Sequence, residues 1–286
     1  MARNTNRSQM GGKIRKAAFF AMAPAAFFAA AVAHASEAGQ SFTDSAFFSK
    51  IRAVRLEAAA MTEERQSRFN PVFDGGSYLC RNSRGETGTN YTHLDTLLQT
   101  RKATCADLRN VDLNSKDLSG ADLRAADLRG AGFLYGTFAK ADFSGADLSQ
   151  AHMDSASFQA ASFSYAKINN SNMSKDNISA ADFTGARMNS TDMSFANAQR
   201  AVFAGADLAG VNFSYTDFRD ASFAGARLAN SQLRSADLRG AVFVGADLST
   251  ADLTGANLNG AKYSHCTKLP FGEDKARELG MVKIPN

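Results

Sequence analysis

An apolar residue returns at every fifth position from Leu108 to Tyr263, thirty-two times in succession, without an insertion or a deletion. This central residue is Leu, Phe, Met, Ile or Tyr in every unit but one, which has Ala198. Ala stands two positions earlier in 23 of the 32 units, and Asp or Asn stands one position earlier in 19 of them. Self-similarity at a fixed period predicts a repeat architecture, and such architectures mostly present binding surfaces.

A period of five matches neither a helix, which needs about 3.6, nor a strand, which needs 2. Within one unit, however, the central residue and the small residue two positions earlier share a face, as in a strand. The other three positions are polar, small or Gly. Each unit is therefore predicted to be a short extended stretch followed by a bend. Stacked coils would bury the apolar pair and join their backbones at roughly 4.8 Å.

A second period of twenty residues groups the units into coils. One column of central residues is aromatic at seven of its eight positions, and another column has no aromatic residue. The first column is Leu123, Phe143, Phe163, Phe183, Phe203, Phe223, Phe243 and Tyr263; the second is Leu108, Leu128, Leu148, Ile168, Met188, Leu208, Leu228 and Leu248. Four units per coil predict eight coils, with one inner wall of Phe and one aliphatic inner wall.

The repeat Ala-(Asp/Asn)-(Leu/Phe)-x-x, as in residues 121–125, resembles the pentapeptide-repeat family. The resemblance covers 158 of the 286 residues. It implies an all-β fold, a right-handed quadrilateral parallel β-helix, and the handedness comes from the resemblance alone. The family that this chain resembles includes proteins that mimic DNA and protect topoisomerases from quinolones, and the resemblance therefore implies this function as one alternative. It indicates the fold more closely than the function, because function depends on sites placed on a fold.

The N-terminus has the features of a secretory signal peptide. Five basic residues and no acidic one precede Glu37, an apolar stretch runs from Ala17 to Ala33, and the sequence Ala-His-Ala ends just before Ser36. This order of basic region, apolar region and small-residue cleavage site is typical of export. A membrane anchor is the alternative, but seventeen residues interrupted by Pro24 are short for a span. We expect a periplasmic or secreted protein that begins at Ser36 and keeps no integral membrane span.

The chain divides into four expected parts: a signal peptide at 1–35, an N-terminal helix, loop and cap region at 36–105, the β-helix at 106–265, and a C-terminal cap at 266–286. Apolar residues at three and four steps predict an amphipathic helix over 44–68. We interpret it as a cap, with a dimer seam as the alternative. Residues 70–105 are expected to be loop-like with a short helix near 92–98, and 273–279 to form a final helix.

Three cysteines remain in the mature chain. Cys80 and Cys105 flank the segment that leads into the first coil, whereas Cys266 lies about eight coils away. Export permits a disulfide. A Cys80–Cys105 bond is therefore favoured, and three reduced thiols are the alternative.

Motifs for chemistry are missing. The sequence has no Ser/His/Asp order, no Gly-rich phosphate loop and no metal motif, so we expect no enzyme, no cofactor and no metal site. Asp recurs with the repeat, and its side chain is expected to bond nearby backbone at the bends. Two columns test this: Asp107, Asp127 and Asp147 stack like charges, while Arg187, Asp207, Arg227 and Asp247 alternate in sign and predict a salt ladder.

Two charged residues, Lys116 and Asp176, occupy the inward slot that usually holds Ala, three coils apart. A buried carboxylate without partners is costly. We expect Asp176 to bond locally to Ser171 or Thr191 or to form a bulge, and a ligand or partner site is the alternative.

Outward slots suggest contact surfaces. Apolar residues flank the Phe column in its later coils, where earlier coils carry Asp, Ser and Thr, and three aromatic residues share another outward column. Clustered exposed apolar side chains mark contact sites more often than isolated ones. The candidate interaction residues are Val202, Ala204, Ala224, Val242 and Val244 on the first surface, and Tyr135, Phe195 and Tyr215 on the second.

Charge separates the function classes. Removal of the signal peptide takes away five positive charges, so the formal net charge falls from +4 to −1. Residues 106–263 carry 17 Asp, no Glu and 14 Lys plus Arg, which is a mixed surface. We therefore expect an exported, non-catalytic scaffold that binds a protein or cell-envelope partner and no nucleic acid, with a homodimer left open. The alternatives are a DNA-mimicking, topoisomerase-protecting protein and a carbohydrate-active β-helix.

Overall fold

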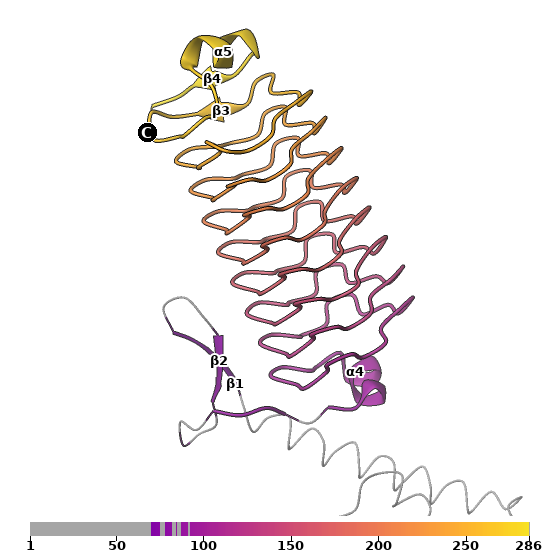
Figure 1. Ribbon diagram of the computed structural model, residues 1–286. Coiled ribbons are helices and arrows are strands. Elements are labelled where there is room, and N and C mark those ends of the chain that lie inside the picture. The colour runs from indigo at the N-terminus through magenta and orange to yellow at the C-terminus, as the bar shows by residue number, and fades with distance from the viewer. Residues whose placement is uncertain (1–69, 75–77, 82–83, 85–86, 91, 286) are drawn as a thin grey trace, which may run out of the picture. The chain divides into compact units, whose positions relative to one another are not determined.

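The computed structural model describes residues 70–74, 78–81, 84, 87–90 and 92–285, all within the unit Ala60–Asn286. The signal segment at 1–35 and the helix expected at 44–68 lie outside the described residues. In chain order the structure contains a hairpin, a short helix, the repeat coils and a C-terminal cap (Figure 1).

The repeat region is a right-handed quadrilateral β-helix whose coils stack in parallel (Figure 1). Each unit contributes one parallel bridge to the residue twenty positions further on, from Lys102↔Asp122 to Val242↔Lys262. A central residue donates its N–H to the next coil, as from Phe203 to the Ser222 carbonyl at 2.7 Å. The preceding residue donates to the previous coil, as from Val202 to the Ala181 carbonyl at 2.9 Å. The two directions pair the backbone on both sides of each coil, and the predicted four units per coil are confirmed.

The corners of the coils are β-turns with a left-handed residue. The Ala206 N–H donates to the Phe203 carbonyl at 3.1 Å, and Gly205 between them has φ of +64°. Every fifth residue from 105 to 260 has a positive φ except Thr250. Gly is favoured at this position because it adopts a positive φ without steric cost. Thr250 is β-branched, and its hydroxyl instead accepts a hydrogen bond from the Asn230 N–H at 2.9 Å.

The interior is a continuous core of the central and small residues. Phe203 is fully buried between Phe183 and Phe223, with ring centroids 4.8 and 5.1 Å apart and interplanar angles of 3° and 7°. The inner wall of Phe is therefore confirmed, and successive rings stack from Phe143 to Phe243. Ala198, the one small central residue, is also fully buried.

Short helices close both ends of the stack. Helix α4 (Leu94–Thr100) precedes the first coil, and its Leu97 is fully buried in the core. At the other end, β3 (Lys262–Tyr263) pairs in parallel with β4 (Val282–Lys283). Helix α5 (Glu273–Glu278) lies between these two strands in the sequence, and its Ala276 is buried. The helices expected near 92–98 and 273–279 are thus confirmed as α4 and α5.

The segment expected to be loop-like contains a β-hairpin. Strands β1 (Asn70–Phe73) and β2 (Tyr78–Arg81) pair in antiparallel fashion, with Val72 opposite Leu79 and Phe73 opposite Tyr78. The expectation of loop was wrong for these eight residues. Four-residue strands carry too little alternation to be recognised in the sequence, and contacts with distant coils stabilise them here.

Candidate functional site

The described part of the chain offers no site for metal chemistry. It contains no group of three or more His, Cys, Asp or Glu side chains that could hold a metal ion. No helix of the described residues is both long enough and apolar enough to cross a bilayer.

In the like-charged column, Asp107 and Asp127 each pair with an arginine two residues along the chain, whereas Asp147 lies 3.7 Å from Lys167 of the next coil. Arg109 Nη2 lies 2.6 Å from Asp107 Oδ2, and its Nε lies 3.7 Å from the carboxylate of Asp127 in the next coil. Arg129 repeats the pairing with Asp127 at 2.6 Å. The hydrogen bond from the Arg109 side chain lowers the pKa of Asp107. The predicted like-charge cost is thus removed by bonding, as two guanidinium groups are interleaved with the stacked carboxylates.

The alternating column forms no continuous salt ladder, contrary to the expectation. Among the described residues, Arg187, Asp207 and Arg227 make no ion pair within 4.0 Å, and one buried oxygen of Asp207 has no hydrogen-bond partner. Only Asp247 is paired, with Lys268 at 2.9 Å. The residue two positions after Asp207 is Ala209, which offers no side-chain donor. Asp207 therefore lacks the same-bend partner that Asp107 has in Arg109, whereas Asp247 takes its partner, Lys268, from the next coil.

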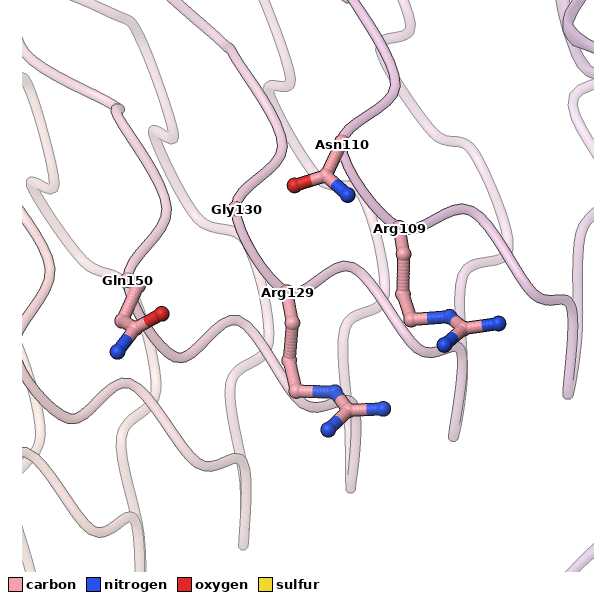
Figure 2. A pocket seen from close by; sticks show the side chains of 5 residues that line it. All are labelled: Arg109, Asn110, Arg129, Gly130 and Gln150. Atoms are coloured by element: carbon pink, nitrogen blue, oxygen red, sulfur yellow. The ribbon is translucent and has the colours of Figure 1, made fainter.

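A shallow hollow of about 190 Å³ lies beside the paired arginines. Figure 2 shows Arg109 and Arg129 running side by side from successive coils, with Asn110, Gly130 and Gln150 on the other side of the hollow. Both guanidinium groups are already bonded to Asp107 and Asp127. The hydrogen bond to Asp107 raises the pKa of Arg109 further. We assign no anion site to this hollow, because its positive charges are already paired within the repeat.

Lys116 was expected to point inward, and this was wrong. The residue is exposed. The position twenty residues earlier, Thr96, belongs to α4 and not to a coil, so nothing of the β-helix encloses the lysine from that side. The long side chain can therefore extend into solvent at the end of the stack.

Asp176 is buried as expected, but its bonding differs from the expectation. Its Oδ1 accepts a hydrogen bond from the Ala156 N–H of the previous coil at 2.8 Å, while within the described structure Oδ2 has no partner. Ser171 and Thr191 donate to backbone carbonyls instead, at 2.7 and 2.6 Å. Burial raises the pKa of Asp176 well above its ordinary value, the bond from Ala156 opposes this, and the charge of Asp154 adds to it.

The face that carries the Phe column changes character along its length. In the earlier coils a chain of hydrogen bonds covers it, including Ser144 with Ser162 at 2.9 Å and Ser164 with Asp182 at 2.9 Å. In the later coils the same slots, apart from Ser222, hold small apolar side chains, all of them half-buried. These residues are Val202, Ala204, Ala224, Val242 and Val244.

Two of the three outward aromatic residues form one feature. The rings of Phe195 and Tyr215 stack with centroids 4.9 Å apart and an interplanar angle of 5°, and the residues are 57% and 59% exposed. Tyr135 is 69% exposed but lies three coils from Phe195 in the same corner column. The structure therefore brings Phe195 and Tyr215 together and leaves Tyr135 apart.

The disulfide between Cys80 and Cys105 is confirmed, with an S–S distance of 2.12 Å, and it ties the hairpin to the first coil. Cys266 is exposed near the other end of the stack. The bond was predicted from position alone, and the hairpin that it holds was not.

The hairpin also packs along a corner of the coils, which sequence reasoning missed. The ring of Phe73 lies 4.6 Å from that of Tyr165 and 5.3 Å from that of Tyr78. Tyr78 occupies the space that a side chain at Gly145 would need. In the sequence, Gly145 and Tyr165 in one corner column were the signals for this contact, and neither residue by itself indicates that a hairpin packs there.

The family model described as "Pentapeptide repeats" matches the sequence in eight copies, which together cover more than half of the chain. The matched residues are 104–133, 138–174, 177–214, 201–240 and 231–266. None of the curated proteins matches.

Several solved structures are similar. A trypsin-treated form of QnrB1, a plasmid-mediated fluoroquinolone resistance protein, is 21% identical over 64% of this chain and 89% of its own, with a TM-score of 0.47. HetL, a pentapeptide repeat protein involved in heterocyst differentiation regulation in the cyanobacterium Nostoc sp. strain PCC 7120, is 25% identical over 68% and 95%, with a TM-score of 0.26. A pentapeptide repeat protein from the Arabidopsis thaliana thylakoid lumen is 24% identical over 43% and 74%, with a TM-score of 0.22.

Proposed function

Since this chain belongs to the pentapeptide repeat family, we propose that it is an exported, non-catalytic scaffold that binds a protein or cell-envelope partner through its outer surface. The fold itself is a pentapeptide-repeat scaffold. In such a fold the interior is filled by the repeat, so specific recognition must come from the outward positions.

The observation that carries the proposal is the exposed ring pair of Phe195 and Tyr215. The other Phe residues between 133 and 243 are fully buried inside the coils, whereas Phe195 is 57% exposed. An exposed stacked pair adds little to the stability of the stack and offers a large apolar surface to a partner. Aromatic side chains of this kind often carry most of the binding energy at protein interfaces.

Polar side chains surround the ring pair on both adjoining faces. Asn212 donates to Asp192 at 3.0 Å on one side, and Gln199 donates to Asp217 at 2.8 Å on the other. An apolar centre with a hydrogen-bonding rim is the usual composition of a protein-binding surface. This arrangement supports a macromolecular partner.

The ion pairs favour a partner other than a topoisomerase. DNA mimicry needs an uncompensated row of negative charge, but Arg109, Arg124 and Arg129 each pair with a carboxylate of the earlier coils. Glycoside hydrolysis needs two carboxyl groups that flank an accessible bond. Among the described residues, the carboxyl group with a strongly raised pKa is that of Asp176, which is fully buried.

Export is supported by the N-terminal sequence, and it has its own test. N-terminal sequencing of the protein purified from its native cells should give Ser36 as the first residue. A full-length cytoplasmic product that begins at Met1 would contradict export and would favour the topoisomerase alternative.

The ring pair is tested with the mature chain as bait for envelope extracts of the native cells. We expect a captured partner that is lost when Phe195→Ser and Tyr215→Ser are combined. Tyr135→Ser is the matched control, because it removes an exposed ring from the same column, and it should leave capture unchanged. A capture profile that is the same for all three chains would contradict the assignment of this surface.

A further inference from the structure

One corner of the β-helix has two different halves. We call it the hairpin corner, and its positions are Cys105, Ala125, Gly145, Tyr165, Gly185, Gly205, Gly225 and Gly245. The hairpin covers the first half through three contacts at successive heights. Cys80 is bonded to Cys105, Tyr78 fills the space over Gly145, and the ring of Phe73 packs on that of Tyr165.

The second half of the hairpin corner continues the surface on which the hairpin packs, but no described residue packs over its glycines. A Cβ added at Gly205 or Gly225 would meet no atom within 4 Å, and one at Gly245 would meet only the backbone of Gly225 at 4.0 Å. Val202, Ala204, Ala224, Val242 and Val244 lie alongside this half, where the first half has its hydrogen-bonded Ser and Asp chain. The corner surface on which the hairpin packs thus continues over the later coils, where its neighbouring side chains are apolar.

The hairpin presents a second apolar face away from its own coils. Side chains alternate between the two faces of a strand. Phe73 and Tyr78 are paired across the hairpin and contact Tyr165 and Gly145, so the neighbouring pair Val72 and Leu79 lies on the opposite face. Val72 is 44% exposed.

We propose that two copies of this chain associate in antiparallel orientation along their hairpin corners. Each copy places the outer hairpin face, Val72 and Leu79, on the bare second half of the other. The two-fold axis passes at the height of Gly185, so that Tyr165 of one copy lies at the height of Gly205 of the other. This interface is separate from the ring pair of Phe195 and Tyr215 and goes beyond the proposed function.

The shape of the corner selects a second copy as the occupant. A two-fold interface places one patch against itself, so a raised part must meet a recessed part of the same patch. Here the raised half and the recessed half lie on one corner, on opposite sides of Gly185, and only the antiparallel orientation brings them together. The chain already packs Tyr78 and Phe73 on this corner, so its second half continues an interface of known chemistry.

Mixed cross-linking tests the orientation. All chains carry Cys266→Ser and retain the native disulfide. One chain carries Val72→Cys, and a differently tagged chain carries Ala204→Cys. After mild oxidation, the mixture should give about tenfold more cross-linked dimer than either chain alone, because association raises the effective concentration of the two thiols. Ala139→Cys is the matched control, a half-buried Ala in the same slot on another face, and it should not cross-link to Val72→Cys.

Two results would overturn the proposal. Cross-linking of the Val72→Cys chain with itself would show that the two hairpins pack on each other and not on the second half of the corner. Sedimentation equilibrium that gives the mass of a single copy at all concentrations would show that no second copy binds, as when residues 36–69 of the same chain cover the corner. The Phe195→Ser and Tyr215→Ser changes should leave the cross-link intact, so this proposal and the proposed function can fail separately.

Discussion

The face beside the Phe column has a uniform interior and two unlike exteriors. Inside, Phe143 stacks on Phe163 at 4.9 Å in the earlier coils, and Phe223 stacks on Phe243 at 5.1 Å in the later ones. Outside, the earlier coils carry a hydrogen-bonded chain and a disulfide-anchored hairpin, and the later coils carry bare Val and Ala. The difference shows that the inward positions specify the coil, whereas the outward positions are free to specify contacts.

Energetics explain this division. Each inward ring is fully removed from water, and losing such a ring costs several kcal/mol in a packed core. Exposed ion pairs and surface hydrogen bonds contribute about 0–1 kcal/mol each. Outward residues can therefore change along the stack without loss of the fold, and a consistent outward pattern indicates a contact.

The largest predicted effect is the loss of one ring from the inner wall. Phe203→Ala in the later coils should lower the free energy of unfolding by roughly 3–5 kcal/mol, through lost burial and a cavity. Phe163→Ala in the earlier coils is the matched variant and should cost the same, because both rings are fully buried between two others. Denaturant unfolding measures the loss, and hydrogen exchange should show neighbouring coils opening first. Unchanged exchange in both variants would contradict the inward assignment.

The disulfide should affect only the earlier half. Cys80→Ser opens a loop whose ends are 25 residues apart, and chain entropy alone makes such a bond worth about 3 kcal/mol. Hydrogen exchange should rise in β1, β2 and the first coils, while the coils after Gly185 keep their protection. Cys266→Ser is the control and should change neither half. Loss of protection in the later coils would show that the two halves are not independent.

Asp176 breaks the rule that inward positions are apolar, and its effect should depend on pH. Its pKa is raised in the fold, so the penalty is absent below the unfolded pKa of about 4 and grows as pH rises toward the folded value. Asp176→Asn should therefore stabilise the protein at pH 7, by about 1.4 kcal/mol for each unit by which the fold raises the pKa, because the amide keeps the hydrogen bond from Ala156 and carries no charge. Parent and variant should converge near pH 4. If parent and variant were equally stable at both pH values, the ionised carboxyl group would have the hydrogen-bond partners that it needs.

The surface carboxylates should show the opposite sign. Hydrogen bonds from Ser249 and Lys268 lower the pKa of Asp247 to about 2. Its contribution is present above the unfolded pKa and is lost as pH falls through about 2. Asp247→Asn should therefore reduce stability at pH 7 and make little difference at pH 2, as measured by thermal unfolding at the two pH values. A variant that lowers the stability equally at both would contradict the pairing.

A further prediction concerns the corners, whose left-handed backbone is alike in both halves. Gly210 lies in another corner column, has φ of +68°, and an added methyl group would meet only the Ser190 hydroxyl at 3.8 Å, so Gly210→Ala should cost about 1–2 kcal/mol from backbone strain alone. Ala180 has φ of 57°, and Ala180→Gly should relieve the same strain, less the extra entropy of the unfolded chain. Denaturant unfolding should give opposite signs for the two changes. Equal signs would show that the corners are not equivalent.

The interior could be predicted from the sequence because its constraint is repeated. The twenty-residue column of Phe, the four units per coil and the capping helices α4 and α5 all follow from positions where burial leaves little choice. The hairpin could not be predicted, because its contact with Tyr165 joins residues that are far apart in the sequence and its strands are only four residues long.

Charged positions were predicted less well for a local reason. Arg109 reaches Asp107 because both lie on one bend, while Asp207 is followed by Ala209 and finds no such donor. Lys116 is exposed because α4 replaces a coil before it. In each case the surroundings of the charged group depend on a nearby residue or element. A column of charges twenty residues apart does not show what lies there.

Exchanging the exterior of one half for that of the other tests most directly whether the outward residues alone decide association. The changes Val202→Asp, Ala204→Ser, Val242→Asp and Val244→Ser place the residues of slots 142 and 144 on the later coils. Analytical ultracentrifugation and thermal unfolding are measured on the same samples. We predict a single-copy mass in place of the two-copy mass of the parent, with a stability change within about 1 kcal/mol. A variant that unfolds, or one that keeps the two-copy mass, would contradict the account.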